Sequence, residues 1–279
     1  MDATDFKRAS HAVWEAMAPG WDDRHAYFEE SARPVTERML ELLAPAPGQA
    51  MLDLAAGTGV VGFAASALVG PSGHVIVSDF SEAMVEAAER HASKLGLENV
   101  DCRVLDAEQL DLPDAAIDGV LCRWGYMLMP NPEAAFAETH RVLRSGGRLS
   151  CAVFGRPEQN PWAGLPSRVL QERGHMPPPD SGAPGILALA DHDRLRSLFA
   201  GAGFLYPQIE EVPFTWRFPD MDAYWRFLID SAGAIALVVG RLDEDEQERV
   251  REEVTERAQS FAGPDGIELP AVSVVASAS

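Results

Sequence analysis

The sequence predicts an α/β fold, in which helices cover both faces of a doubly wound, mostly parallel sheet. From residue 50 onward, almost continuous apolar segments, typical of strands buried on both sides, alternate with segments of helical periodicity. The first strand runs into a turn with two glycines one residue apart, Gly57-Thr58-Gly59, and an apolar helix follows. Such a unit predicts a nucleotide site, because small residues let a ligand approach the backbone and the helix start offers N–H groups.

The predicted core is a run of strands separated by helices. Strands are expected at about 50–55, 74–79, 100–105, 117–123 and 147–154. The helices between them are expected at about 60–68, 81–95 and 133–144. Ser81 is placed to cap the second of these helices, because its hydroxyl can accept a backbone N–H of the first turn.

Further elements flank this core. Two helices are expected before it, at 5–17 and 32–43, joined by a turn over 19–27. After residue 155 prolines interrupt the pattern, and the expected helices lie at 161–173, 191–202, 222–241 and 243–261. Strands at 206–212 and 272–276 bring the expected sheet to seven strands.

These elements divide the chain into three predicted parts. They are an N-terminal helical cover (1–45), a ligand-binding core (46–212 and 268–279) and a helical insertion or lid (213–267). Six aromatic residues crowd into 214–227 of the insertion. A small satellite core is one interpretation of them, and a lid over an apolar molecule or a homodimer surface is the other.

Composition excludes several classes of partner. The formal net charge of −20 disfavours nucleic acid, because a phosphate backbone would be repelled. No apolar run approaches the length of a membrane span, and the charged N-terminus is unlike a signal peptide. The three cysteines fall in predicted buried strands without metal-ligand spacing. We therefore expect a cytoplasmic protein with a small-molecule substrate and no metal site.

The glycine turn leaves two cofactors open. Gly57-Thr58-Gly59-Val60-Val61-Gly62 satisfies the dinucleotide pattern, with Asp79 as its ribose-binding acid, so an NAD-dependent oxidoreductase is one hypothesis. Asp53, four residues before the first glycine, argues against it, because a carboxylate there would repel a pyrophosphate. A ligand with an ammonium and a sulfonium group would instead be attracted.

Five ordered motifs within about residues 35–155 carry a resemblance. They are D-L-A-A-G-T-G at 53–59, V-S-D-F-S-E-A-M at 77–84, L-D-A-E at 105–108, L-P-D-A-A-I-D at 112–118 and R-V-L-R-S-G-G-R-L at 141–149. With them the chain resembles the class I S-adenosylmethionine-dependent methyltransferases, and is similar to the ubiquinone/menaquinone C-methyltransferase group. The resemblance implies a Rossmann-like methyltransferase fold whose last strand enters the sheet antiparallel, between the fifth and sixth. It also implies S-adenosyl-L-methionine as cofactor.

The expected cofactor site gathers at the carboxyl ends of the strands, where ligands bind in such sheets. Asp79 would accept the ribose hydroxyls, Phe80 and Met84 would flank the adenine, and Asp106 would accept from its amino group. Asp53 would lie near the ligand's amino group. The full expected set is Asp53, Ala55, Gly57, Thr58, Gly59, Asp79, Phe80, Met84, Asp106, Ala107 and Arg123.

The acceptor side is less determined by the sequence. Methyl transfer needs an in-line approach, and a general base is required only for a nucleophile with a proton of high pKa. The candidate catalytic residues are Tyr126, His25 and His175. Tyr126 stands in the segment 123–129, whose Trp and Met residues suggest an apolar pocket.

The sequence thus predicts methyl transfer from S-adenosylmethionine to a small, largely apolar acceptor. A quinone- or isoprenoid-like precursor or a natural-product precursor would fit, with methylation at carbon or oxygen. Besides the oxidoreductase, a non-catalytic module that binds S-adenosylmethionine remains as an alternative.

Overall fold

In the computed structural model, which describes residues 3–178 and 182–279, the described residues form one sheet of eight strands. Seven follow the order β3-β2-β1-β4-β5-β8-β6, and β7 pairs with β8 alone. The first five run parallel, and β8 lies antiparallel between β5 and β6. This confirms the predicted fold class and the predicted place of the last strand. The strands are Ala50–Leu54 (β1), His74–Asp79 (β2), Val100–Val104 (β3), Ile117–Arg123 (β4), Leu143–Phe154 (β5), Gln208–Phe218 (β6), Ala262–Gly263 (β7) and Gly266–Ala278 (β8).

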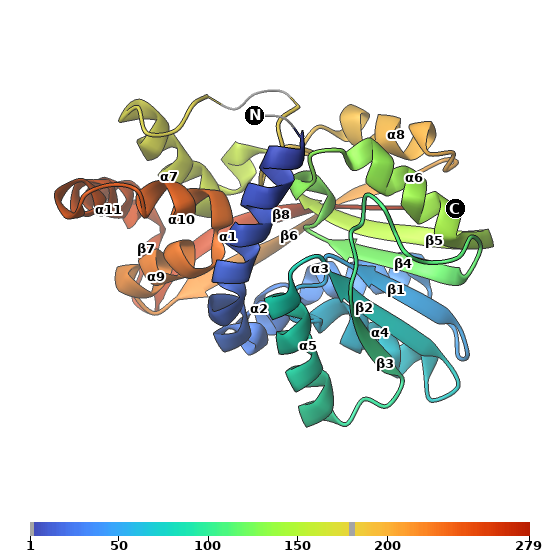
Figure 1. Cartoon of the computed structure of the whole chain (residues 1–279). Coiled ribbons are helices and arrows are strands. Elements are labelled where there is room, and N and C mark those ends of the chain that lie inside the picture. Colours follow the sequence, from blue (N-terminus) through green and yellow to red (C-terminus); the bar gives the residue numbers. More distant parts are fainter. Residues whose placement is uncertain (1–2, 179–181) are drawn as a thin grey trace.

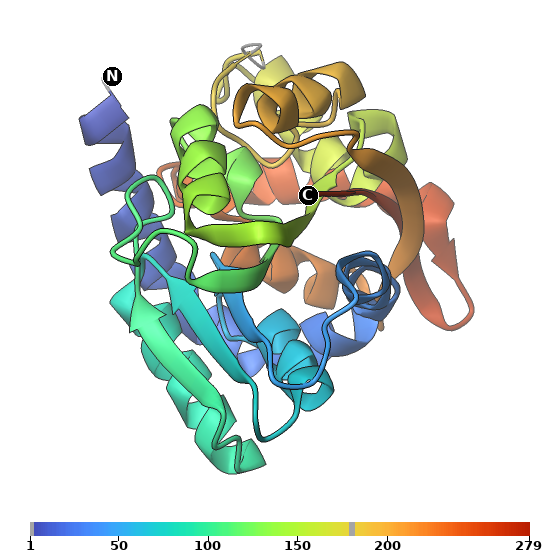
Figure 2. The ribbon, with the colours of Figure 1, turned by 90° about the vertical axis from the view of Figure 1, so that its right-hand side faces the viewer.

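Helices cover both faces of this sheet. In Figures 1 and 2, α6 and α8 lie on one face and α3 and α4 on the other. The helices are Ala3–Asp23 (α1), His25–Ser31 (α2), Arg33–Leu43 (α3), Val60–Val69 (α4), Glu82–Leu95 (α5), Pro132–Val142 (α6), Pro161–Glu172 (α7), His192–Gly201 (α8), Met221–Ser231 (α9), Gly233–Val239 (α10) and Glu244–Ala258 (α11). None of these helices combines the length and apolarity needed to cross a lipid bilayer.

Local sequence explains why the central elements start and stop where they do. The side chain of Ser81 accepts the Met84 amide N–H at 3.2 Å and so caps α5, as predicted. Gly96 ends the same helix in the left-handed region, at φ +67°. The strands β1 and β4 are buried along most of their length, which accounts for their almost continuous apolar sequence.

The N-terminal region differs from its prediction. The expected turn over 19–27 is wrong, because α1 continues through Pro19 and Gly20 to Asp23 and α2 begins at His25. A Cβ at Gly20 would lie 2.4 Å from the Asp230 carbonyl oxygen, so the helix packs tightly on α9 at this point. Tertiary packing has overridden the local breaking signals. Figure 1 shows α1, in dark blue, lying between α5 and the pair α9 and α10.

The C-terminal half carries longer strands than expected. The strand predicted at 206–212 extends to Phe218, so residues 213–218 of the predicted helical insertion belong to the sheet. The strand predicted at 272–276 covers Gly266–Ala278. The helix predicted over 222–241 is broken at Ala232 into α9 and α10. Whether the helices between β6 and β8 act as a lid stays a prediction.

Candidate functional site

A cavity opens at the carboxyl ends of β1, β2, β3 and β4, and we call it the first cavity. The turn after each of these strands contributes to its wall, and α1 closes one side. Eight of the eleven residues predicted for the cofactor line it: Ala55, Gly57, Asp79, Phe80, Met84, Asp106, Ala107 and Arg123. The structure therefore brings these separate chain segments to one place.

The glycine turn connects β1 to α4 at the edge of this cavity. Gly57 and Gly59 have φ values of +55° and +89°, which L-residues with side chains rarely adopt. A Cβ at Gly59 would also lie 2.4 Å from the Phe63 ring. Gly62 has another task, since a Cβ there would lie 2.5 Å from Val77. The third glycine of the dinucleotide pattern thus serves helix–sheet packing.

Asp79 ends β2 and lines the first cavity. One carboxylate oxygen accepts the Gly57 amide N–H at 2.9 Å, and the other accepts the Ser81 amide N–H at 3.1 Å. Its burial raises its pKa, and these backbone donors oppose that rise. Because Ser81 caps the helix, Asp79 is not needed for that purpose and stays a candidate for a ligand contact.

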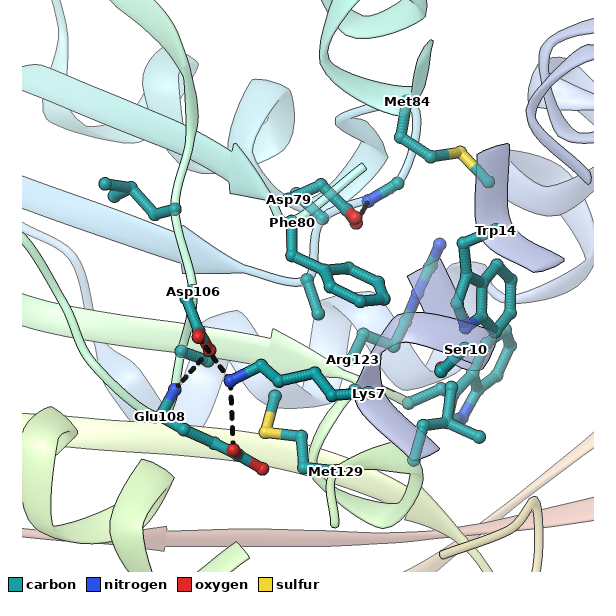
Figure 3. A pocket seen from close by; sticks show the side chains of 18 of the residues that line it. Lys7, Ser10, Trp14, Asp79, Phe80, Met84, Asp106, Glu108, Arg123 and Met129 are labelled. Atoms are coloured by element: carbon teal, nitrogen blue, oxygen red, sulfur yellow. Dashed lines mark hydrogen bonds and ion pairs between the residues drawn. The ribbon is translucent and has the colours of Figure 1, made fainter. Parts of the chain in front are cut away.

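Lys7 contributes to the cavity from α1, which the sequence did not indicate. Its ammonium pairs with Asp106 and with Glu108, the latter at 3.0 Å (Figure 3). Ser10, Trp14 and Trp21 line the same cavity. These contributions come from a helix far away in sequence, and the local pattern of α1 carries no signal for them.

Strained backbone marks the point where β1 and β4 end side by side. Ala55 has φ +50° and Trp124 has φ +64°, and both line the first cavity. A bulky residue in the left-handed region costs free energy, and such residues concentrate at functional sites. Gly125 follows Trp124, and a Cβ there would come within 2.6 Å of the Ala55 Cβ.

Arg123 carries a positive charge into this region. Its guanidinium donates to the Thr36 hydroxyl at 2.6 Å and lies 4.9 Å from the centroid of the Trp124 ring. Burial lowers the pKa of Arg123 to about 10, against the opposing effect of the Asp53 and Glu29 charges. The structure shows no ion pair between Arg123 and Asp53 among the residues it describes.

Three predicted cofactor residues do not line the first cavity. Asp53 is fully buried behind the turn, where it accepts the Gly62 amide N–H at 2.6 Å. Thr58 is also buried, and its hydroxyl is hydrogen-bonded to His25 Nδ1 at 2.8 Å. Gly59 caps α4. A direct contact of these three residues with the cofactor therefore stays a prediction.

The predicted catalytic side chains lie away from the cavity. Tyr126 is fully buried, and its hydroxyl is hydrogen-bonded to Thr139 at 2.6 Å. It was expected to face the acceptor pocket but lines neither cavity, because the 3₁₀ turn Tyr126–Leu128 places this ring in the core; its catalytic role stays a prediction. His175 does not line the first cavity; its Nε2 lies 2.7 Å from the Glu246 Oε1, which belongs to α11. Stacking against His91 holds the His25 ring next to Thr58, and burial lowers the pKa of His25 to about 4.

A second cavity, of about 290 Å³, adjoins the first. Ser10, Trp14, Trp21, Trp124 and Leu128 line both. Its remaining wall is mostly apolar and comes from α1, α2, β5, α7, β6, α9, α10 and the segment 184–186. Among the predicted aromatic cluster, Trp216 lines this cavity, whereas Phe218, Tyr224 and Phe227 pack in the core.

The described residues include one group with ligand atoms close enough to hold a metal ion, His11, Glu15 and Glu82. His11 Nε2 already lies 2.8 Å from Glu82 Oε2. None of the three lines either cavity.

Comparison with known proteins gives the context of this geometry. A family model described as a methyltransferase domain matches residues 45–173. Nocamycin O-methyltransferase of Saccharothrix syringae is 35% identical to this chain. The matched part covers 64% of this chain and 61% of that enzyme's length. Ubiquinone/menaquinone biosynthesis C-methyltransferase UbiE of Hydrogenovibrio crunogenus is 30% identical over 69% of this chain and 80% of its own length.

Solved structures share the fold at lower identity. The YcgJ protein of Bacillus subtilis superposes with a TM-score of 0.58 over 87% of this chain and 96% of its own, at 18% identity. This likeness concerns the arrangement of the elements alone.

Proposed function

This chain belongs to the class I S-adenosylmethionine-dependent methyltransferases, and from that premise we propose that it methylates a small, largely apolar acceptor held in the second cavity. Family membership selects S-adenosylmethionine over a dinucleotide. The observation that carries the proposal is the contact between the two cavities, which share five lining residues. An acceptor in one would lie next to a donor in the other.

The residues of the first cavity fit the adenosyl part of the cofactor. Asp79 offers a buried carboxylate that can accept ribose hydroxyls, and Gly57 leaves the backbone open beside it. Phe80, Met84 and Leu105 provide apolar faces for a purine ring. The Asp106 carboxylate accepts from the Lys7 ammonium and can accept from the adenine amino group as well.

The chain's own part in the reaction is to position the reactants and exclude water. When bound, S-adenosylmethionine supplies an electrophilic methyl group. The aromatic and aliphatic walls of the second cavity would hold the acceptor in line with it, and such positioning can supply much of the rate. α1 contributes to both cavities and separates their contents from solvent on that side.

Two variants test the assignment of the two cavities. Ala234→Trp places a large side chain at the second cavity and should raise KM for the acceptor without changing the Kd for S-adenosylhomocysteine. Asp79→Ala should weaken S-adenosylhomocysteine binding, measured by calorimetry. Methyl transfer is followed with labelled S-adenosylmethionine across a panel of apolar acceptors. Cofactor binding without transfer to any acceptor would favour the non-catalytic alternative.

A further inference from the structure

The charges around the two cavities restrict the acceptor. Resting on the proposed function, we propose that the acceptor is an apolar cyclic enol, acidic enough to be ionised near neutral pH, that binds the second cavity as its anion. The protein would then not need to remove the acceptor's proton.

The first support is the lack of a side chain that could act as a base at the acceptor. Among the described residues that line the second cavity, Arg241 is the one charged side chain, and no His, Tyr, Cys, Asp or Glu joins it. The described lining of the second cavity therefore offers no side chain that titrates as a general base.

The acidic residues of the first cavity all have hydrogen-bond or ion-pair partners within the protein. Asp79 accepts two backbone N–H groups, and Asp106 and Glu108 pair with the Lys7 ammonium. These carboxylates belong to the part of the site that fits adenosine. Arg123 lies at the same cavity and carries a positive charge.

Arg241 gives the second cavity a preference for anions. The protein has 43 acidic residues against 23 basic ones, so a cavity whose single charged lining residue is basic stands apart from the rest of the chain. Within the described residues, the Arg241 side chain has no ion pair or hydrogen bond. Its charge is therefore available to attract a ligand anion at the cavity mouth.

The reaction balances without a protein base. The enol loses its proton to water, and an electron pair on its oxygen or adjacent ring carbon forms the new bond to the methyl carbon. The bond between that carbon and sulfur breaks, and its electron pair stays on sulfur. An anion and a sulfonium thus become two neutral products, which an apolar cavity favours because it solvates charges poorly.

The test uses two acceptors with one skeleton. 4-Hydroxycoumarin is an acidic enol, whereas 7-hydroxycoumarin is a weaker phenolic acid of the same size. The full chain, with EDTA to remove metal assistance, should methylate the enol several-fold faster near pH 7, in kcat/KM, and this ratio should grow about tenfold when the pH is lowered to about 6. For 7-hydroxycoumarin, kcat/KM should rise about tenfold per pH unit until that compound itself is ionised.

Variants connect this preference to Arg241. Arg241→Met should raise KM for 4-hydroxycoumarin about fivefold, Arg241→Lys should largely restore it, and both should leave the Kd for S-adenosylhomocysteine unchanged. Arg226→Met is the matched control, because Arg226 is an exposed residue of α9 outside the cavity lining.

Several results would overturn the inference. They are equal rates with both coumarins, one pH break common to both, or transfer to a neutral amine or thiol but to neither coumarin. In these cases the proposed methyl transfer would still stand. Binding of S-adenosylhomocysteine without transfer to any acceptor would instead refute the proposed function itself.

Discussion

Replacing Asp53 by asparagine tests the electrostatics beneath the glycine turn. One oxygen of this buried carboxylate accepts the Gly62 amide N–H, and the other has no partner among the described residues. Burial raises the pKa of Asp53 from its ordinary 3.8 to about 7, although the Gly62 N–H and the Arg123 charge oppose that rise. The folded protein therefore holds this proton more tightly than the unfolded chain does.

The sign and size of the effect follow by linkage. Because the folded-state pKa is the higher one, the stability contributed by this group falls as pH rises from about 4 to about 7. A rise of about 3 pKa units corresponds to roughly 4 kcal/mol in full, and about half of it, ~2 kcal/mol, falls between about pH 5.5 and about pH 8.5. An asparagine keeps an acceptor for Gly62 and does not titrate.

Urea unfolding of the ligand-free protein at these two pH values measures the effect. We expect the free energy of unfolding of Asp53→Asn, relative to wild type, to rise by about 2 kcal/mol from the lower to the higher pH. Any fixed cost of the amide cancels in this double difference. Glu98→Gln, at an exposed position, is the control variant: it shows how much the free energy of unfolding changes when one negative charge is removed from a chain of net charge −20. A relative stability constant within about 0.5 kcal/mol would refute the reasoning.

Three other predictions concern the turn, the cofactor contact and the thiols. Asp79→Ala should weaken S-adenosylhomocysteine binding by about 2 kcal/mol in calorimetry, from loss of charged hydrogen bonds, and an unchanged Kd in a folded variant would count against the assignment. Gly59→Ala should destabilise by more than Gly96→Ala, because both glycines have positive φ but a Cβ at Gly96 meets nothing within 4 Å; equal thermal shifts would contradict this. Cys102 is part-buried and burial raises its pKa to about 11, while the other two cysteines are fully buried. A thiol reagent should therefore react slowly with the native protein and should titrate three thiols in urea. Fast reaction of more than one thiol in the native protein would show that the core opens.

The parallel strands of the sheet could be predicted because each of them carries its own signal, whereas the two-residue strand β7 was not predicted. The four strands β1 to β4 are found within about one residue of their predicted ends. For β1, β2 and β4 the signal is a short, buried apolar run between helices, whereas the edge strand β3 is only partly buried. The path of α1 could not be predicted in the same way. Its continuation through Pro19 and Gly20 depends on contact with Asp230, which local propensity does not reveal.

The same contrast holds for the site. Strand ends carrying Asp79 and Asp106 could be assigned to one rim, because the carboxyl ends of parallel strands share an edge. Lys7 could not be assigned, because it reaches that rim from a helix that packs there through tertiary contacts. Tyr126 was expected to face the cavity, yet its neighbours Trp124 and Leu128 do so instead. A 3₁₀ turn after a strand changes which side chains face outward, and sequence spacing does not fix that choice.

Trp124 explains why the acceptor side depends on three-dimensional packing. Its φ of +64° costs a bulky L-residue roughly 1–2 kcal/mol, so the conformation persists only if other contacts hold the ring. Those contacts are present: the indole N–H donates to the Ser273 hydroxyl at 2.8 Å, Phe154 stacks at 4.6 Å, and the Arg123 guanidinium lies over the ring. Because Ser273 belongs to β8, the last strand fixes a residue that faces both cavities. The wall between the two cavities is thus set by β8, so a change in β8 should alter the proposed methyl transfer without contacting either proposed ligand.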